Sequence, residues 1–289
     1  MITSGMQLKA KIRNIANGDG NKAQALLRNF MMERLLERIS LSKYKRNFIL
    51  KGGMLVSAIV GLKFRTTMDI DTTVNSLSLD LNSANKIINE ILSIDICDGC
   101  SFSIRNRESI MEGFDYPGIR FTLVGSFDGL YQTIKIDIST GDVITPSAIE
   151  FTYRLMFENR SIKIYSYNIE TLIAEKLETI MSRGIANTRM RDFYDIFYIW
   201  NCKNDMINRD DLAKAFCLTS KHRNSFELFS SIDKILSSIR IDFSMERNWT
   251  NYKKLSRNID DVSWQDVNDT INDIVKILKP YIDNYLNEK

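Results

Sequence analysis

A short apolar run ends in two glycines and is followed by a helical segment and then by an extended segment that carries two aspartates. Residues 48–50 predict a strand, residues 54–61 a helix, and residues 63–75 a second extended stretch. Successive side chains of a strand point to opposite faces, so Asp69 and Asp71 share a face and lie roughly 7 Å apart along the chain. This order of elements predicts a sheet with helices packed against it and two carboxylates on one face.

The glycine pair, Gly52 and Gly53, has the properties of a phosphate-binding turn. Without a Cβ, both residues let backbone amides approach a phosphate group, and the N-terminus of the following helix adds partial positive charge. Carboxylates such as those of Asp69 and Asp71 are the ligands that Mg²⁺ prefers, and this ion usually keeps substrate phosphates among its ligands. We therefore predict that the glycines seat a triphosphate and that the two aspartates hold Mg²⁺ or Mn²⁺. The alternative is a solvated strand end.

A third acid occurs in a later strand. Residues 134–138 alternate, and Asp137 interrupts an apolar face next to Lys135. Placed beside the strand of Asp69, Asp137 could accept the proton of an attacking hydroxyl or bind a second metal ion. The alternative is an ordinary surface pair with Lys135. The succession of Gly-Gly, Asp-x-Asp and a later strand acid is more specific than any one of the three.

The rest of the chain predicts an α+β protein, with a mixed sheet flanked by helices in its first half and a mainly helical second half. Beyond the segments named above, the predicted strands are 118–124, 131–138 and 161–165, with a turn at 125–129. The predicted helices are 6–16, 22–39, 81–92, 169–183, 191–200, 211–217, 226–240 and 267–286. We place the domain boundary near residue 166, which gives domains at 1–166 and 167–289.

The second of these helices has an apolar stripe. Its apolar residues recur at spacings of three and four, which leaves Arg28, Glu33 and Glu37 on the face predicted to point outward. This pattern is typical of a scaffold and not of a catalytic site.

Composition narrows the class of protein. With 44% hydrophobic residues and only three prolines, the chain is expected to be globular and rich in helix. It has no secretion signal and no apolar stretch approaching the roughly 18 residues that a spanning helix needs, so we expect a cytoplasmic protein without membrane contact. Four cysteines are too few for a disulfide framework in a chain of 289 residues, and they are expected to be reduced thiols.

Basic residues are concentrated near the N-terminus. Residues 1–65 hold 13 Lys or Arg against three acids, although the net charge of the whole chain is only +3. This end is the side on which a polyanion such as RNA is expected to bind. A solvated basic helix face is the alternative.

Three stretches together resemble the polymerase-beta type of nucleotidyltransferase and, within that superfamily, the AbiEii/AbiGii-like toxins of bacterial abortive-infection and toxin–antitoxin systems. The matching residues are Phe48-Ile49-Leu50-Lys51-Gly52-Gly53-Met54-Leu55, Arg65-Thr66-Thr67-Met68-Asp69-Ile70-Asp71, and Lys135-Ile136-Asp137-Ile138 with Gly141-Asp142. A later helical motif also matches, through Glu175-Lys176-Leu177, Arg183 and Arg191-Asp192-Phe193-Tyr194-Asp195. The resemblance covers roughly residues 8 to 200, so residues 1–166 are expected to be the nucleotidyltransferase-like domain.

The resemblance implies a transferase that moves a nucleotidyl group from a nucleoside triphosphate to an acceptor, reported for some relatives to be the 3′ end of tRNA. It implies that Asp69 and Asp71 are metal ligands, that Lys176 contacts the triphosphate and that Asp192 completes the active site. It also implies a cognate antitoxin encoded by a neighbouring gene. Gly53 stands where many members of the superfamily carry serine, so backbone amides alone are expected to hold the phosphates here.

The helical motif has an interpretation of its own. Lys176 and Arg183 are seven residues apart and share a helix face, while Asp192 and Asp195 share a face of the next helix. The cations could neutralise charge that develops on the phosphates, and Arg65 is a further candidate for nucleotide binding. The alternative is a set of interhelical ion pairs.

Other classes of function fit the sequence less well. A single histidine, His222, and no nucleophile elbow exclude the usual Ser-His-Asp hydrolase, and no Walker motif is present. Cys97 and Cys100 lack a second pair for a zinc site, and the aromatic cluster at 193–200 is more typical of a core than of a base-stacking surface. Two alternatives to transfer onto RNA stay open, namely a catalytically silent nucleotide- or RNA-binding module and nucleotidylation of a protein.

Overall fold

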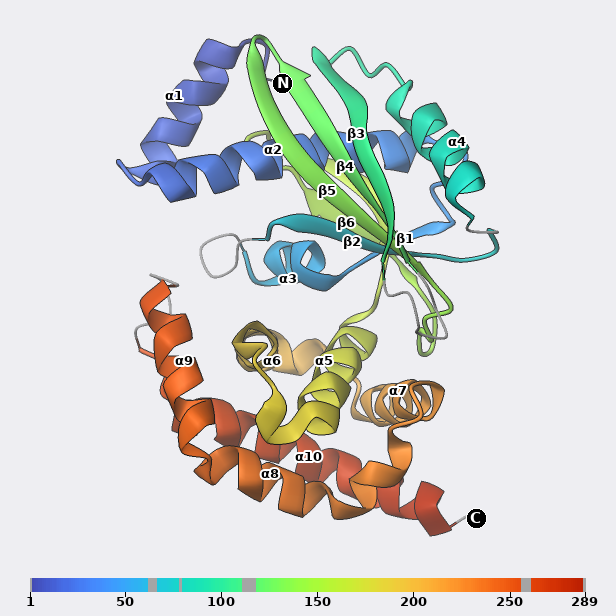
Figure 1. Ribbon diagram of the computed structural model, residues 1–289, viewed down its shortest axis with the longest axis vertical. Helices are drawn as coiled ribbons and strands as arrows, with labels where there is room; N and C mark the ends of the chain where they lie inside the picture. The colour runs from blue at the N-terminus through green and yellow to red at the C-terminus, as the bar shows by residue number, and fades with distance from the viewer. Residues whose placement is uncertain (1, 62–66, 78–79, 111–117, 256–260, 288–289) are drawn as a thin grey trace. The chain divides into compact units, whose positions relative to one another are not determined.

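Seven strands form one mixed sheet among the residues that the computed structural model describes, which are 2–61, 67–77, 80–110, 118–255 and 261–287. Contacts divide the chain into two units (Figure 1). The first, the sheet unit, comprises Met1–Ala58, Thr66–Asp142 and Ile149–Ser166. The second, the helical unit, comprises Ile59–Arg65, Val143–Ala148 and Tyr167–Lys289. The predicted α+β class is confirmed.

The order of strands in the sheet is β3-β4-β5-β2-β1-β7-β6. β1 pairs parallel to β7 and β2 parallel to β5, while the other neighbours are antiparallel. The strands are β1 (Phe48–Lys51), β2 (Asp69–Val74), β3 (Cys100–Ile110), β4 (Gly118–Phe127), β5 (Leu130–Thr140), β6 (Ile149–Arg154) and β7 (Ser161–Ser166). The strands of the two predicted acid-bearing segments, β2 and β5, are therefore direct neighbours.

Side-chain caps fix where several helices begin. Ser4 caps α1 (Gly5–Ala16), Asp19 caps α2 (Gly20–Leu41) and Asp80 caps α4 (Leu81–Leu92), because their oxygens accept backbone N–H groups of the first turn. α3 (Gly52–Val60) follows β1 directly. Asn168 and Asn208 cap α5 (Ile169–Arg183) and α7 (Arg209–His222) in the helical unit in the same way.

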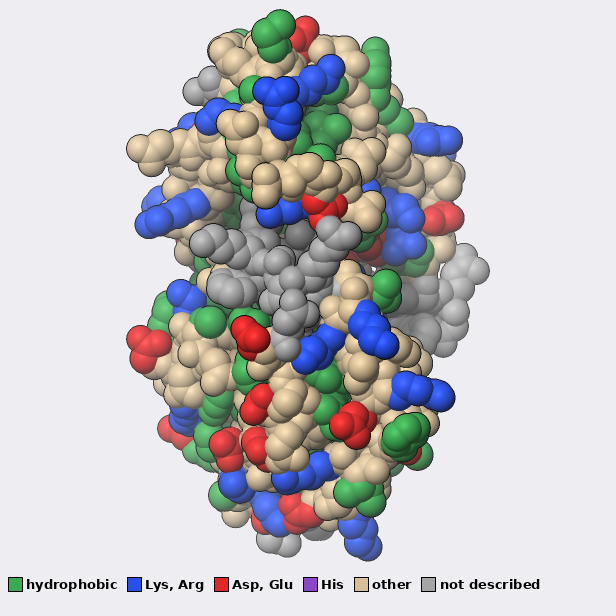
Figure 2. Space-filling model, turned by 90° about the vertical axis from the view of Figure 1, so that its left-hand side faces the viewer, with side chains coloured by type: hydrophobic (Ala, Val, Ile, Leu, Met, Phe, Trp, Pro, Cys, Tyr) green, Lys and Arg blue, Asp and Glu red, His purple; other side chains and the backbone are tan. Residues whose placement is uncertain are grey.

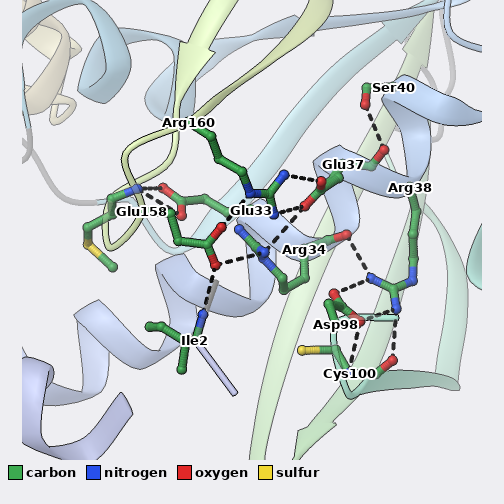
Figure 3. Close-up of polar contacts among 11 residues, drawn as sticks. Ile2, Glu33, Arg34, Glu37, Arg38, Ser40, Asp98, Cys100, Glu158 and Arg160 are labelled. Atoms are coloured by element: carbon green, nitrogen blue, oxygen red, sulfur yellow. Dashed lines mark hydrogen bonds and ion pairs between the residues drawn. The ribbon is translucent and has the colours of Figure 1, made fainter. Parts of the chain in front are cut away.

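The helix α2 packs against β5 and β7 and is buried over most of its length (Figure 1). The prediction that Glu33 and Glu37 point outward was wrong: they are 1% and 7% exposed. Each has partners in the sheet unit that make burial possible. Glu33 accepts from the backbone N–H of Met156 at 3.0 and 3.1 Å, and Glu37 pairs with Arg160 (Figure 3). Burial raises the pKa of Glu33 to about 8.

A hairpin joins β4 to β5 more tightly than the sequence suggests. The predicted turn at 125–129 was too long, because β4 continues to Phe127 and only Asp128 and Gly129 make the turn. Both turn residues have positive φ, 43° and 74°, which is the geometry of a two-residue hairpin. The strands β3 and β6 were not predicted, although β6 and the first half of β3 alternate apolar and polar residues.

Helices make up the second unit. Besides α5 and α7, they are α6 (Met190–Lys203), α8 (Ile232–Ile241), α9 (Phe243–Leu255) and α10 (Trp264–Asn287), with 3₁₀ turns at Gly184–Ala186, Asn204–Met206 and Phe226–Ser231. The predicted helix 226–240 is in fact a 3₁₀ segment followed by α8, and α9 was not predicted. Phe193, Tyr194 and Trp200 are buried, which confirms that the aromatic cluster belongs to the core. No described helix is long and apolar enough to span a bilayer.

Candidate active site

Four charged side chains form a row across one face of the sheet unit, which we call the acidic row. In register, Lys51 of β1 stands opposite Asp71 of β2, Asp71 opposite Asp137 of β5, and Asp137 opposite Arg120 of β4. Residues directly opposite one another on paired strands project from the same face of a sheet. The isoleucines that alternate with Asp137 are buried on the other face, against which α2 packs. Alternation and register thus bring together acids that lie 66 residues apart in the sequence.

The glycine pair contacts the acidic row. Gly52 has φ of +61°, and a Cβ at this position would lie 2.1 Å from Oδ2 of Asp71. The backbone N–H of Gly53, in the first turn of α3, donates to the same oxygen at 3.3 Å. Both the positive φ and the close approach require glycine at position 52. The start of α3 and Asp71 are therefore parts of one structure.

The surroundings of Asp71 disfavour its negative charge. Its pKa is raised, first because it is withdrawn from solvent and second because the carboxylate of Asp137 lies beside it. Lys51 and the amide of Gly53 act in the opposite direction without cancelling these effects. A site of this kind favours a cation among its carboxylates.

Arg120 holds Asp137 through both carboxylate oxygens. Its Nε donates to Oδ1 at 2.7 Å and its Nη2 to Oδ2 at 2.6 Å, and the side chains are 28% and 17% exposed. The hydrogen bond to Asp137 raises the pKa of the guanidinium. Asp137 is thus paired across the sheet with Arg120. Sequence reasoning missed this residue, although alternation in 118–124 places Arg120 between the buried Ile119 and Phe121.

Lys51 has a second acidic neighbour. Its Nζ lies 2.5 Å from Oδ2 of Asp142, just beyond the end of β5, and Ser139 donates to the same oxygen at 2.8 Å. Burial opposes the charge of Asp142, but Lys51 and Ser139 outweigh it and lower the pKa of this carboxyl. Both residues lie within the matching stretches of the sequence, where no role was predicted for them.

A second cluster of predicted residues lies in the helical unit. Lys176 of α5 contacts Asp192 at 2.8 Å and Asp195 at 2.7 Å, both on α6. Arg189 donates to the other oxygen of Asp192 at 2.6 Å. Against the effect of burial, these two cations lower the pKa of Asp192 to about 2. The interhelical ion pairs weighed as an alternative are therefore present, and a role of Lys176 and Asp192 toward a triphosphate stays a prediction.

Arg183 and Arg65 are the two other residues that were predicted to bind nucleotide. Arg183 is exposed in the last turn of α5 and lines a groove of about 610 Å³ together with Lys234 and Ser238 of α8. Arg65 lies outside the described residues.

The chain matches one known protein family over most of its length. The family described as "Nucleotidyl transferase AbiEii toxin, Type IV TA system" matches residues 34–273, which include the acidic row, the glycine pair and the Lys176 cluster. The chain belongs to this family. It is a nucleotidyltransferase of the toxin–antitoxin type, as its sequence resemblance predicted.

Solved structures show more distant likenesses to this AbiEii-family protein. A Helicobacter pylori protein described as a candidate nucleotidyltransferase is 17% identical, with a TM-score of 0.48, over 89% of this chain and 97% of that one. JHP933 from Helicobacter pylori is 16% identical, with a TM-score of 0.48, over 92% and 97%. A nucleotidyltransferase-like antigen of Paracoccidioides brasiliensis is 15% identical, with a TM-score of 0.35, over 81% and 94%. Likenesses at this level establish no shared site residue. No curated protein matches the chain.

The AbiEii-family chain offers carboxylate oxygens, which are the ligands that a hard divalent cation prefers. Asp69 and Asp71 project from one face of β2, and Asp137 adds a carboxylate at the register of Asp71. Such oxygens suit Mg²⁺ or Mn²⁺, and a bound cation would relieve the unfavourable charge of Asp71. Among the described residues, however, no three acidic, histidine or cysteine side chains are close enough together to enclose a metal ion. The carboxylate of Asp137 is turned to Arg120 instead.

Proposed function

We propose that this AbiEii-family protein transfers a nucleotidyl group from a nucleoside triphosphate to a hydroxyl of an RNA acceptor at the acidic row, with release of pyrophosphate. One observation carries the proposal, namely the contact between Gly52, Gly53 and Asp71. It joins a turn suited to phosphate to a carboxylate suited to a metal ion, as nucleotidyl transfer requires.

Each residue of the sheet unit has a role in this proposal. Asp69 and Asp71 hold Mg²⁺ or Mn²⁺, which supplies charge neutralisation at the phosphates when bound. The amides of Gly52 and Gly53 contact the triphosphate. Asp137 either accepts the proton of the acceptor hydroxyl or ligates a second ion.

In the helical unit, the family's pattern makes Lys176 a contact of the triphosphate and Asp192 a further residue of the active site. Arg183 and Arg65 are the remaining candidates for nucleotide binding. These assignments rest on the sequence motif. The ion pairs with Asp192 and Asp195 hold the side chain of Lys176 in place on α5.

The basic N-terminal region supports RNA, and tRNA first, as the acceptor. Lys9, Lys11, Arg13 and Lys22 are exposed on α1 and the start of α2. On the face of the sheet unit that Figure 2 shows, blue side chains predominate over red ones. A surface of this kind attracts the phosphates of RNA without reading its sequence. Labelling of total tRNA tests this acceptor directly.

The family description supports one further expectation, a partner protein. A toxin of a toxin–antitoxin system has a cognate antitoxin, and a small reading frame adjacent to the gene for this chain would be its source. We also expect the protein to act in the cytoplasm, where tRNA and nucleoside triphosphates are present.

Incubation with total tRNA, Mg²⁺ and each α-labelled nucleoside triphosphate in turn tests the proposed function. We expect label on RNA with one or a few of the four nucleotides, and none when the label is on the γ-phosphate, because that phosphate leaves with pyrophosphate. RNase treatment separates label on RNA from label on protein. Label that survives RNase would indicate transfer onto a protein. Nucleotide binding without label on either would indicate the silent binding module.

A further inference from the structure

The ion pair between Arg120 and Asp137 occupies a carboxylate that the proposed chemistry needs. Both oxygens of Asp137 accept hydrogen bonds from the guanidinium, at 2.7 and 2.6 Å. A carboxylate held in this bidentate way offers fewer lone pairs to a metal ion or to a hydroxyl proton. The fixed positive charge of Arg120 also repels a cation that approaches Asp137. The contact with Arg120 therefore restrains Asp137.

The surroundings of Arg120 make this restraint reversible. Its side chain is 28% exposed, so the guanidinium can move without breaking a packed core. On the side away from Asp137, Glu108 of β3 stands opposite Arg120 in register and is exposed. Release from Asp137 would consequently leave the guanidinium beside another carboxylate and not isolated.

We propose that Arg120 is a positioning residue of the transfer reaction, which holds Asp137 through the contact seen here and releases it when the divalent cation binds with nucleotide. The inference rests on the proposed function, since it presumes that the cation binds at the acidic row. This role differs from that of an ion pair that only stabilises the fold, because the contact between Arg120 and Asp137 has to break when the cation binds. The guanidinium and the cation compete for the same carboxylate.

Titration with Mn²⁺ alone, followed by the electron paramagnetic resonance signal of the free ion, tests this competition. We expect Arg120→Gln to bind Mn²⁺ more tightly than the wild type, by roughly tenfold, because a charge-assisted hydrogen bond no longer holds Asp137. In an Asp137→Asn background the same substitution is expected to raise the affinity clearly less, because only the repulsion between the guanidinium charge and the cation is then removed. Arg107→Gln is the matched control, because it removes an exposed arginine from the neighbouring strand β3 without touching Asp137.

The possible results distinguish a failure of this inference from a failure of the proposed function. If Mn²⁺ binding in the wild type depends on Asp71 and label is transferred, but Arg120→Gln binds Mn²⁺ equally or more weakly, then Arg120 only stabilises the fold and the inference is wrong. If the wild type binds no Mn²⁺ at the acidic row and transfers no label, the proposed function fails, and the inference fails with it.

If Arg120→Gln does not fold, NMR of the Arg120 side chain in the wild type tests the inference instead. The Nε–H resonance of Arg120, assigned with the charge-preserving Arg120→Lys, is followed by NMR as Mg²⁺ and a non-hydrolysable nucleoside triphosphate are added. Release from Asp137 predicts a shifted resonance whose proton exchanges faster with water. A resonance that stays unchanged at saturation would overturn the inference.

Discussion

Asp71→Asn is expected to reduce nucleotidyl transfer by about 10²–10³-fold or more, without lowering the midpoint of thermal unfolding. The amide keeps the shape of the carboxylate and can still accept the N–H of Gly53, so the turn at Gly52 is preserved. It removes a charge that burial and the neighbouring Asp137 make unfavourable, as the raised pKa of Asp71 indicates. Loss of activity with unchanged or increased stability is the expected signature of a metal ligand.

Transfer rates with labelled nucleotide and unfolding by differential scanning calorimetry measure the two effects. Asp283→Asn is the control, since it removes an exposed carboxylate from α10 and is expected to change neither quantity. An Asp71→Asn protein that transfers label at the wild-type rate would remove Asp71 from the chemistry. A large loss of stability would instead make its role structural.

Lys176→Met is expected to destabilise the protein by about 3–5 kcal/mol, the usual effect of removing one member of a buried ion pair. Asp192 and Asp195 are 3% and 0% exposed, and the substitution leaves both without the lysine that contacts them. Urea unfolding at neutral pH measures the loss. Lys214→Met, at an exposed lysine of α7, is the matched control and is expected to cost little.

The pH dependence of this loss follows from Asp192. Its folded pKa is lowered to about 2 from an ordinary value of 3.8, so its contribution to stability is present above the ordinary value and disappears as the pH falls through the folded one. We therefore expect the stability difference between the wild type and Lys176→Met to shrink between about pH 4 and pH 2. A difference that stays constant over this range, or a substitution without effect at pH 7, would show that these ion pairs contribute little.

Residue patterns within single segments predicted the strands and helices whose formation depends mainly on residues close in the sequence. Alternation identified β2 and β5, and the recurrence of apolar residues identified α4 at the observed bounds. A special backbone at Gly52 could also be expected, because glycine is the residue that adopts a positive φ without strain.

Features that depend on partners distant in the sequence could not be predicted in this way. Glu33 looks like a surface residue of a helix until the backbone of Met156 is placed beside it. Arg120 becomes part of the acidic row only through the register of β4 on β5. The strand β3 is mostly exposed along its length, so it carries little hydrophobic signal of its own.

Crystals grown with Mn²⁺ and a non-hydrolysable nucleoside triphosphate show whether the metal ion and the nucleotide bind at the acidic row, because anomalous scattering locates the metal ion. We expect an anomalous peak bonded to carboxylate oxygens of Asp69 and Asp71, at roughly 2.0–2.2 Å, with the triphosphate against the amides of Gly52 and Gly53. A nucleotide bound elsewhere, or bound at the glycine pair with no metal peak at the acidic row, would contradict it.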